Sequence, residues 1–261
     1  MRFQLCALLL FVLASPQFLC SQSQVPVSDA RAVALAAQTV TALTNGISVN
    51  DVTLTGTATW TLGSDSESGA VIFLASGTGE SRMDLMLSGG SRTEIRDAST
   101  GTRLGKWIAQ SGASGRFAFH NCQTDAVWFF PVLGSLATGP NVVLLYVGQE
   151  SRRGRSVQHI QSYVYSSAQP GGAALQRLSA MDFYLDATTS LPMAVTFNRH
   201  PDDDAGSNIP VEVAFSNYET VSGVTVPMRV QEYVQGTAVL DVTIASAAFN
   251  TGISVSNFTV N

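Results

Sequence analysis

The sequence predicts an α+β fold that is mainly antiparallel β, in which about 11 strands form a half-open, curved β barrel. Two observations support this prediction: many short segments alternate polar with apolar residues, and Gly-rich or Asp-rich turns join them in immediate succession. A third observation is that two helical segments interrupt the strands. A strongly curved sheet could wrap around apolar helices of this kind.

The composition describes a globular chain with a mildly acidic surface. Of its 261 residues, 45% are hydrophobic and 13% are charged, and the formal net charge is −5. Such a chain is far from disorder, and its scattered basic residues argue against nucleic-acid binding, which needs a concentrated basic patch. No change in composition divides the chain. We therefore expect a single domain from residue 24 to residue 261. We also expect the protein to be a monomer.

The first 23 residues predict a secretory signal peptide. Arg2 supplies the positive charge, and residues 5–13 form an apolar stretch that is too short to span a bilayer as a helix. Ser21 and Ser23 would place small residues before a cleavage site after residue 23. Lipid attachment at Cys20 is an alternative, although a large residue precedes it where a small one is expected. We expect the mature chain in the periplasm or outside the cell.

Residues 28–44 predict the first helix. Ser28 or Asp29 can cap its N-terminus by accepting backbone N–H bonds, and Asn45-Gly46 is a typical helix stop. Apolar residues spaced at three and four positions predict its buried face. They are Val33, Ala36, Ala37, Val40 and Leu43.

The strand pattern begins directly after this helix. Residues 52–60 alternate apolar residues with threonine, whose β-branched side chain suits the exposed face of a sheet. Gly89-Gly90 marks a tight hairpin, and residues 166–177 are expected to form a loop. The expected strands lie at 52–60, 70–75, 82–87, 92–97, 142–147, 157–165, 181–186, 193–197, 211–218, 225–234 and 238–247, with a weaker candidate at 107–108.

Residues 125–138 break the strand pattern and predict a short helix that is apolar nearly all round. A helix of this kind should be buried, so we expect it on the concave side of the sheet. Its large side chains could contact a ligand as a lid, because burying lipid carbons yields about 0.8 kcal/mol per methylene. Alternatively, they fill the barrel as core. The candidate ligand-binding residues are Trp128, Phe129, Phe130, Leu133 and Leu136.

A cysteine–histidine pair is the main candidate for catalysis. Once the signal peptide with Cys6 and Cys20 is removed, only Cys122 remains, so we expect no intramolecular disulfide. On a strand, His120 and Cys122 would share one face, and an imidazole can activate a thiol. A secreted hydrolase is therefore an alternative function. No oxyanion-hole motif accompanies the pair, however, and a buried structural cysteine is the competing interpretation.

Other polar clusters have simpler explanations. The three histidines are far apart and no zinc motif frames them, so we expect neither a metal nor a cofactor. Residues 200–208, including Asp202–Asp204, could hold calcium, but their spacing does not match an EF-hand and suits a solvated turn. Arg152, Arg153 and Arg155 could contact phosphate or lipid headgroups, or could charge a hairpin tip and protect a strand edge.

The C-terminal third carries a more specific pattern. Residues 184–192 (YLDATTSLP) form a strand–turn–strand unit, and residues 213–218 (VAFSNY) with 221–227 (VSGVTVP) form the next hairpin. Residues 249–250 (FN) and Phe258 follow as a terminal segment. Together with the element order, this resembles the LolA/LolB-like family of envelope lipoprotein carriers. The resemblance implies an incomplete antiparallel barrel with helices on its concave side.

The same resemblance implies a non-enzymatic role in holding acyl chains away from water, with envelope lipoproteins as partners. Family carriers are described with an arginine near the cavity, but no motif singles out Arg82, Arg92 or Arg96 in this sequence. We expect the chain to bind or carry an apolar ligand, a lipid or a lipoprotein acyl chain, in a concave cavity. The alternative from another class is a structural or interaction domain whose barrel is completely filled.

Overall fold

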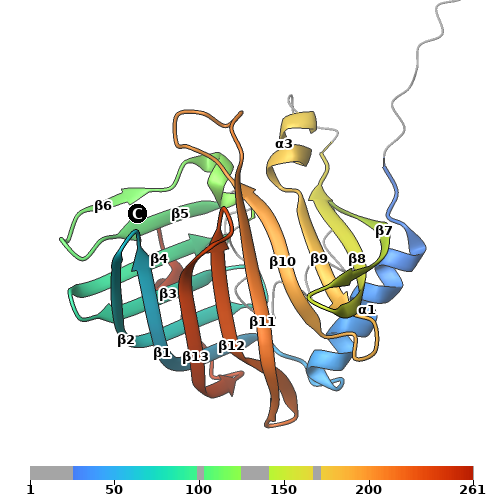
Figure 1. Cartoon of the computed structure of the whole chain (residues 1–261), viewed down its shortest axis with the longest axis horizontal. Helices are drawn as coiled ribbons and strands as arrows, with labels where there is room; N and C mark the ends of the chain where they lie inside the picture. The colour runs from blue at the N-terminus through green and yellow to red at the C-terminus, as the bar shows by residue number, and fades with distance from the viewer. Residues whose placement is uncertain (1–25, 99–102, 125–140, 167–171, 261) are drawn as a thin grey trace, which may run out of the picture.

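The computed structural model describes residues 26–98, 103–124, 141–166 and 172–260. Within them, thirteen antiparallel strands form one sheet in the order β6-β5-β4-β3-β2-β1-β13-β12-β11-β10-β9-β8-β7 (Figure 1). In this part of the chain the outermost strands, β6 and β7, do not pair with each other, so the sheet stays open. The predicted α+β class and the half-open barrel are confirmed.

Neighbouring strands in the sheet are nearly always neighbours in sequence, which favours simple hairpins. The exception is the pair of β1 with β13, which joins the first half of the sheet to the second. The bounds are α1 (Ala30–Thr44), β1 (Asp51–Leu62), β2 (Asp65–Ser76), β3 (Ser81–Leu87), β4 (Gly90–Asp97), β5 (Leu104–Ile108), β6 (Ser114–Arg116), the 3₁₀ helix η1 (Phe119–Cys122), β7 (Val142–Arg152), β8 (Arg155–Val164), α3 (Gly172–Leu178), β9 (Met181–Asp186), β10 (Pro192–Arg199), β11 (Ile209–Val221), β12 (Val224–Val234), β13 (Thr237–Phe249) and the 3₁₀ helix η2 (Val255–Phe258).

Helix α1 begins and ends where the sequence predicts. The Asp29 carboxylate accepts two backbone N–H groups of the first turn, and Asn45 ends the helix in the left-handed conformation with φ 50°. Ser28 has a different role, because its hydroxyl accepts the N–H of Leu144 in β7 at 3.1 Å. The Asp29 N–H donates to the Leu144 carbonyl at 2.7 Å. The start of α1 is thereby fixed to the edge strand β7.

The buried face of α1 differs from the predicted stripe. Val33 and Ala37 are exposed, while Thr39 is buried. Thr39 can be buried because its hydroxyl donates to the Ser190 carbonyl at 2.9 Å, in the turn between β9 and β10. Helical spacing alone cannot indicate such a tertiary contact, so the prediction was one position out on part of the helix. The buried residues of α1 are Ala32, Ala36, Thr39, Leu43 and Thr44.

The sheet curves around α1. The helix packs against β7 and β8 at one end of the sheet and also against β12, four strands further along than β8. One helix can touch strands so far apart only if the sheet bends around it, and Figure 1 shows α1 beside β7 to β9 on the inner side of the curve. We call the sheet face toward α1 the concave face and the opposite one the convex face.

The main apolar core lies on the concave face. Residues that oppose each other across paired strands share a face, as Leu54 of β1 and Phe73 of β2 do here. The core joins α1 to side chains from every described strand except β4, β5 and β6. Phe183 of β9, which is 1% exposed, is the largest of its fully buried side chains. Burying a side chain of this kind contributes about 1.5–3 kcal/mol.

The convex face is covered in part by the end of the chain. After β13 the chain crosses this face, and Phe258 and Val260 pack against Ile95 of β4 in a separate small core. A second small cluster on this face joins Val157 of β8 to Tyr184 of β9. Most remaining positions on the convex face are polar, so the alternation predicted for the strands is confirmed.

Asp51 fixes the beginning of this terminal segment. Its carboxylate accepts the N–H groups of Thr251 at 2.8 Å and Gly252 at 2.9 Å. Burial alone would raise the pKa of Asp51, but the hydrogen bonds from Thr251 and its neighbours outweigh burial and lower it. Asp51 therefore acts as an ionised clamp between β1 and the turn after β13.

One strand, β6, and one helix were not predicted, and β5 was predicted only as a weaker candidate at 107–108. The short strands β5 and β6 contain Gly105 and Gly115, where a Cβ atom would lie 2.8 Å from the Phe117 ring and 2.7 Å from the Trp107 ring. Glycine leaves room for these rings but removes the alternation that marks a strand. Helix α3 was expected as part of a loop. Its residues after Gly172 are mostly good helix formers, which outweighs the preceding glycines.

Strand β2 is longer than predicted and begins at Asp65 rather than at residue 70. Its first half lacks apolar residues because Ser66 and Ser68 lie opposite Thr61 and Thr59 on the convex face. The hydroxyls of Thr59 and Ser68 are 2.9 Å apart. Hydroxyl pairs of this kind stabilise a strand pair without producing a hydrophobic pattern.

Candidate functional site

A cavity of about 280 Å³ lies at the rim of the concave face. It forms where the ends of β1, β10, β12 and β13 approach β3 and β4. Its volume is just below the range of about 300–1,000 Å³ that is typical of small-molecule pockets. We call it the concave cavity. It is lined by Trp60, Thr61, Leu62, Met83, Leu85, Arg92, Glu94, Arg199, Glu232, Val234, Val239 and Leu240.

Strand register brings apolar and charged groups together in this cavity. Trp60 of β1 opposes Leu240 of β13, and both belong to or pack against the main core. In the β3–β4 pair, Leu85 opposes Arg92 and Met83 opposes Glu94 (both on β4). Since opposing residues share a face, the concave face changes from apolar to charged at β4. The cavity lies at this boundary.

The charges in the concave cavity are held by specific partners. The Arg92 guanidinium lies 4.3 Å from the centroid of the Trp60 ring, a cation–π contact. Arg199 Nη1 lies 2.7 Å from Glu232 Oε1, and Glu232 is only 4% exposed. Two arginines and two glutamates line the cavity, so their formal charges balance. Such a cavity can take an apolar group beside the core and a polar group at its rim.

The residues that the sequence singled out as a lid cannot be placed. Trp128, Phe129, Phe130, Leu133 and Leu136 lie outside the described residues, as does the whole predicted helix at 125–138. Their contact with a ligand stays a prediction.

Sequence reasoning missed the charged residues of the concave cavity. A signal for Arg92 and Glu94 was present, because the hairpin at Gly89-Gly90 places them in phase with the apolar residues of β3. No local signal links Arg199 with Glu232, which lie on β10 and β12 and meet only through folding. Arg92 and Arg199 both line the cavity, and only Arg92 is among the arginines that the sequence brought into consideration.

The structure does not provide the shared face that a Cys–His site requires. Residues 119–122 form the 3₁₀ helix η1 rather than a strand, so the prediction of a strand was wrong. With three residues per turn, His120 and Cys122 point in different directions. Cys122 is 1% exposed and its thiol donates to the Ala118 carbonyl at 3.5 Å, while a ring nitrogen of His120 lies 3.0 Å from the Pro201 carbonyl oxygen. Both side chains have structural contacts.

The aspartate-rich segment is a turn between β10 and β11. The Asp204 carboxylate accepts the Gly206 N–H at 2.8 Å and the Ser207 hydroxyl at 2.5 Å. These hydrogen bonds, the hydroxyl of Ser207 first, lower the pKa of Asp204. In the described part of the chain, no three His, Cys, Asp or Glu side chains are placed to hold a metal ion.

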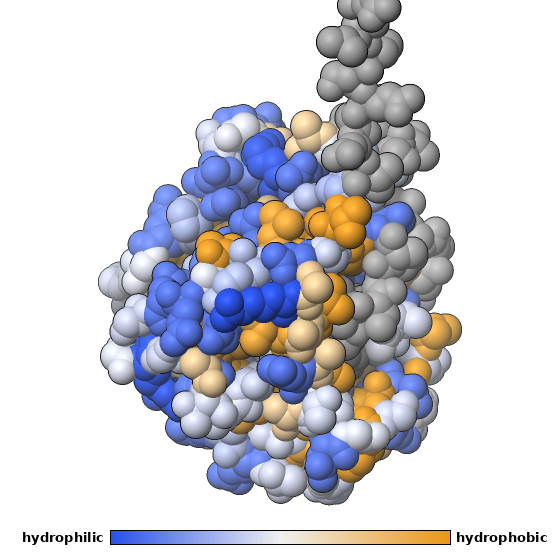
Figure 2. All heavy atoms as spheres, turned by 90° about the vertical axis from the view of Figure 1, so that its right-hand side faces the viewer, coloured by the Kyte–Doolittle hydropathy of each residue, from blue (hydrophilic) through white to orange (hydrophobic). Residues whose placement is uncertain are grey.

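The surface around α1 and β7 contains exposed apolar groups. Figure 2 faces this end of the molecule, and hydrophobic residues gather in the middle of the view, with hydrophilic residues to their left. Val33 of α1 is 37% exposed and Val147 of β7 is 55% exposed. Among the described residues, no helix has the length and hydropathy needed to cross a membrane.

Solved structures share this fold. A domain from Vibrio parahaemolyticus described as an outer membrane lipoprotein-sorting protein is 12% identical with a TM-score of 0.56, covering 87% of this chain and 96% of that one. A LolA superfamily protein from Nitrosomonas europaea is 11% identical with a TM-score of 0.53, covering 88% and 97%. A DUF1329 family protein from Desulfovibrio piger is 10% identical with a TM-score of 0.55, covering 88% and 96%.

These likenesses are structural. No family model matches the sequence, and no curated protein matches it either. The chain has the LolA-like fold with a divergent sequence, and the resemblance seen in its C-terminal third is confirmed at the level of the fold.

Proposed function

We propose that the chain binds the apolar part of a lipid or lipoprotein, an acyl chain, on the concave side of its sheet and catalyses no reaction on it. The observation that supports this most directly is the concave cavity, whose apolar wall continues the main core while its rim carries balanced charges. Each methylene moved from water to this wall would contribute about 0.8 kcal/mol.

The lining residues suggest how such a ligand would be oriented. Trp60, Met83 and Leu85 would contact the chain, and Arg92 and Arg199 at the rim would face its polar end. Residues 128–136 would close over the ligand, as their composition predicts. The lipoprotein-sorting description of the Vibrio parahaemolyticus domain supports this proposal by analogy of fold.

The setting proposed for this function is the periplasm or the cell exterior. It follows from the predicted signal peptide at residues 1–23 and from the LolA-like fold. We further propose a monomer, since a carrier must move with its ligand between partners, which would be envelope lipoproteins or membranes.

The test is binding of a fluorescent fatty acid and its displacement by unlabelled fatty acid. We expect saturable binding to the wild-type protein. Trp60→Ala should lower the affinity by at least about tenfold, because a large apolar side chain contributes roughly 1.5–3 kcal/mol when it is buried against a partner. Val239→Trp, which adds volume at the cavity wall, should lower it as well.

The matched control is Val147→Ala, which removes an exposed apolar side chain that does not line the concave cavity. It should bind the probe as the wild type does, and circular dichroism should show that all variants are folded. If the wild type shows no saturable binding, the proposal is wrong and the filled-barrel alternative takes its place. Equal affinities of the wild type and Trp60→Ala would exclude the concave cavity as the binding site.

A further inference from the structure

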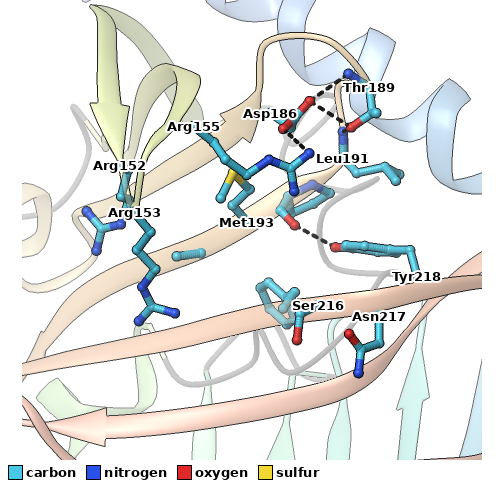
Figure 3. Close-up of a pocket in the computed structure, with 13 residues that line it drawn as sticks. Arg152, Arg153, Arg155, Asp186, Thr189, Leu191, Met193, Ser216, Asn217 and Tyr218 are labelled. Carbon is cyan, nitrogen blue, oxygen red and sulfur yellow. Dashed lines mark hydrogen bonds and ion pairs between the residues drawn. The ribbon is translucent and has the colours of Figure 1, made fainter.

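A second cavity, of about 400 Å³, lies under the tip of the β7–β8 hairpin (Figure 3). Figure 3 shows three arginines of this hairpin on one side and Ser216 and Asn217 of β11 on the other. We call it the arginine cavity. It shares no lining residue with the concave cavity. The proposed acyl-chain site does not use it.

The hairpin geometry aims these side chains at the convex face. Arg153 and Gly154 have φ 50° and φ 76°, as a two-residue type I′ turn requires, so Arg152 and Arg155 pair directly across the tip. Arg152 and Arg155 are in phase with Val157, which belongs to the small apolar cluster on the convex face. Arg152 stacks over the Tyr184 ring of the same cluster at 3.8 Å.

The arginines exceed their partner carboxylates by one charge. Arg152 and Arg153 bind the two oxygens of Glu212 at 2.5 Å and 2.6 Å. Arg155 Nη2 lies 2.7 Å from Asp186 Oδ2. Three cations therefore face two anions, in a chain whose overall charge is −5. Among the residues that line the arginine cavity are three arginines and one acidic residue, Asp186.

Both carboxylate oxygens of Asp186 have partners, so Asp186 holds Arg155 in a fixed position. Its other oxygen accepts the N–H groups of Thr188 at 3.0 Å and Thr189 at 2.8 Å. Burial alone would raise the pKa of Asp186, but these hydrogen bonds and the charge of Arg155 outweigh burial and lower it. The turn that contains them is fixed to α1 through the hydrogen bond from Thr39 to Ser190.

The guanidinium groups can still bind another anion. Within the described residues, the ion pairs of Arg153 and Arg155 each use one nitrogen, whereas a guanidinium carries five N–H donors. Their side chains are 52% and 59% exposed, so the remaining donors are accessible. Leu191 and Met193 supply apolar lining next to them. Planar guanidinium groups bind carboxylate and phosphate through paired hydrogen bonds.

We propose that the arginine cavity binds an amphiphilic anion: one phosphate or carboxylate group held by Arg153 and Arg155, joined to a short apolar group that packs against Leu191 and Met193. The ligand neutralises the excess positive charge, and its apolar group covers Leu191 and Met193. The site would be present whether or not the concave cavity binds an acyl chain.

The experiment titrates the full mature chain with hexyl phosphate, hexanoate and inorganic phosphate, by calorimetry and by NMR of the Asn217 backbone amide. We expect hexyl phosphate to bind more tightly than inorganic phosphate and to shift the Asn217 signal. Arg155→Gln should weaken hexyl phosphate about tenfold, the typical effect of losing one hydrogen bond to a charged group. Binding should weaken at high salt.

Arg229→Gln is the matched control, because Arg229 lies on the convex face, pairs with Asp241 and does not line the arginine cavity. It should bind hexyl phosphate as the wild type does. An equal loss in both variants, no loss in Arg155→Gln, or no shift at Asn217 would overturn the proposal. Equal affinities for hexyl phosphate and inorganic phosphate would contradict the proposed contact of an apolar group with Leu191 and Met193.

Vesicle binding distinguishes a membrane headgroup from a soluble amphiphile as the source of the anion. Co-sedimentation with vesicles of anionic phospholipid, absent with neutral vesicles and lost in Arg155→Gln, would identify a membrane headgroup. Hexyl phosphate binding without vesicle binding would identify a soluble amphiphile. Trp60→Ala should leave all of these results unchanged, so failure here can be distinguished from failure of the proposed acyl-chain function.

Discussion

Two ion pairs on opposite faces of β12 have nearly the same shortest N–O distance but very different surroundings. On the concave face Glu232 pairs with Arg199 at 2.7 Å, and the Glu232 side chain is 5% exposed. On the convex face Arg229 pairs with Asp241 at 2.6 Å, with side chains 43% and 35% exposed. Burial, rather than distance, decides what each pair contributes, because water screens the second pair more than the first.

The same contrast holds for the whole sheet. The concave face carries one continuous apolar core, and the charged side chains that line the concave cavity lie at the rim of this face, on β4, β10 and β12. The convex face carries small clusters, ion pairs and hydroxyl pairs such as Thr55 with Ser246, whose oxygens are 2.6 Å apart. We therefore expect substitutions of similar size to have very different effects on the two faces.

The largest contrast should come from truncating one side chain on each face. Phe183→Ala should lower the free energy of unfolding by about 3–5 kcal/mol, since it leaves a cavity in the main core. Thr59→Ala removes an exposed hydroxyl on the convex face and should change it by about 0.5 kcal/mol or less. Urea denaturation of both variants measures the difference. Similar effects at the two positions would show that the concave face is not the main source of stability.

A smaller contrast should separate the two ion pairs. Arg199→Met removes the guanidinium that pairs with the buried Glu232 and should cost about 2–4 kcal/mol, slightly less than a fully buried pair because Arg199 is 27% exposed. Arg229→Met on the convex face should cost about 0–1 kcal/mol. Both are again measured by urea denaturation, and 1 M salt should reduce only the second effect. A larger cost for Arg229→Met would contradict the argument from burial.

The fold was predictable because its signals are local. Residues such as Val52 to Trp60 alternate with a period of two, and short turns follow such segments. Each hairpin is therefore predictable from its own two strands and the turn between them. The predictions that failed concern features that depend on tertiary contacts. Thr39 is buried with a hydrogen bond to the β9–β10 turn, and the Trp107 ring lies where a side chain at Gly115 of β6 would stand.

The candidate site was less predictable for the same reason. Trp60 and Arg92 come from different hairpins, and Arg199 meets Glu232 across β11, so the sequence does not show that they share a cavity. Apolar composition drew attention to residues 128–136 instead, because clustered aromatic residues are visible without knowledge of the fold.

The third prediction, whose main effect is smaller than those of Phe183→Ala and Arg199→Met, tests how the convex face is covered. Asp51→Asn should lower the free energy of unfolding at pH 7 by about 1–3 kcal/mol, because the amide keeps only one acceptor oxygen and places an NH2 donor against the N–H of either Thr251 or Gly252. The exposed Asp203, in the turn before β11, provides Asp203→Asn as a control with little effect.

The effect of Asp51→Asn should depend on pH. The pKa of Asp51 is lower in the folded chain than its ordinary value, so ionised Asp51 stabilises the fold above about pH 4, the usual range for an unfolded aspartate. This contribution is lost as the pH falls through the lower, folded pKa, and the two proteins should then become equally stable. Hydrogen exchange at Gly252 and Ile253 should rise in Asp51→Asn at pH 7, because their N–H groups lose the carboxylate. If exchange rises instead in the main core on the concave face, the terminal segment is part of that core's folding unit, and the two faces are not energetically separate.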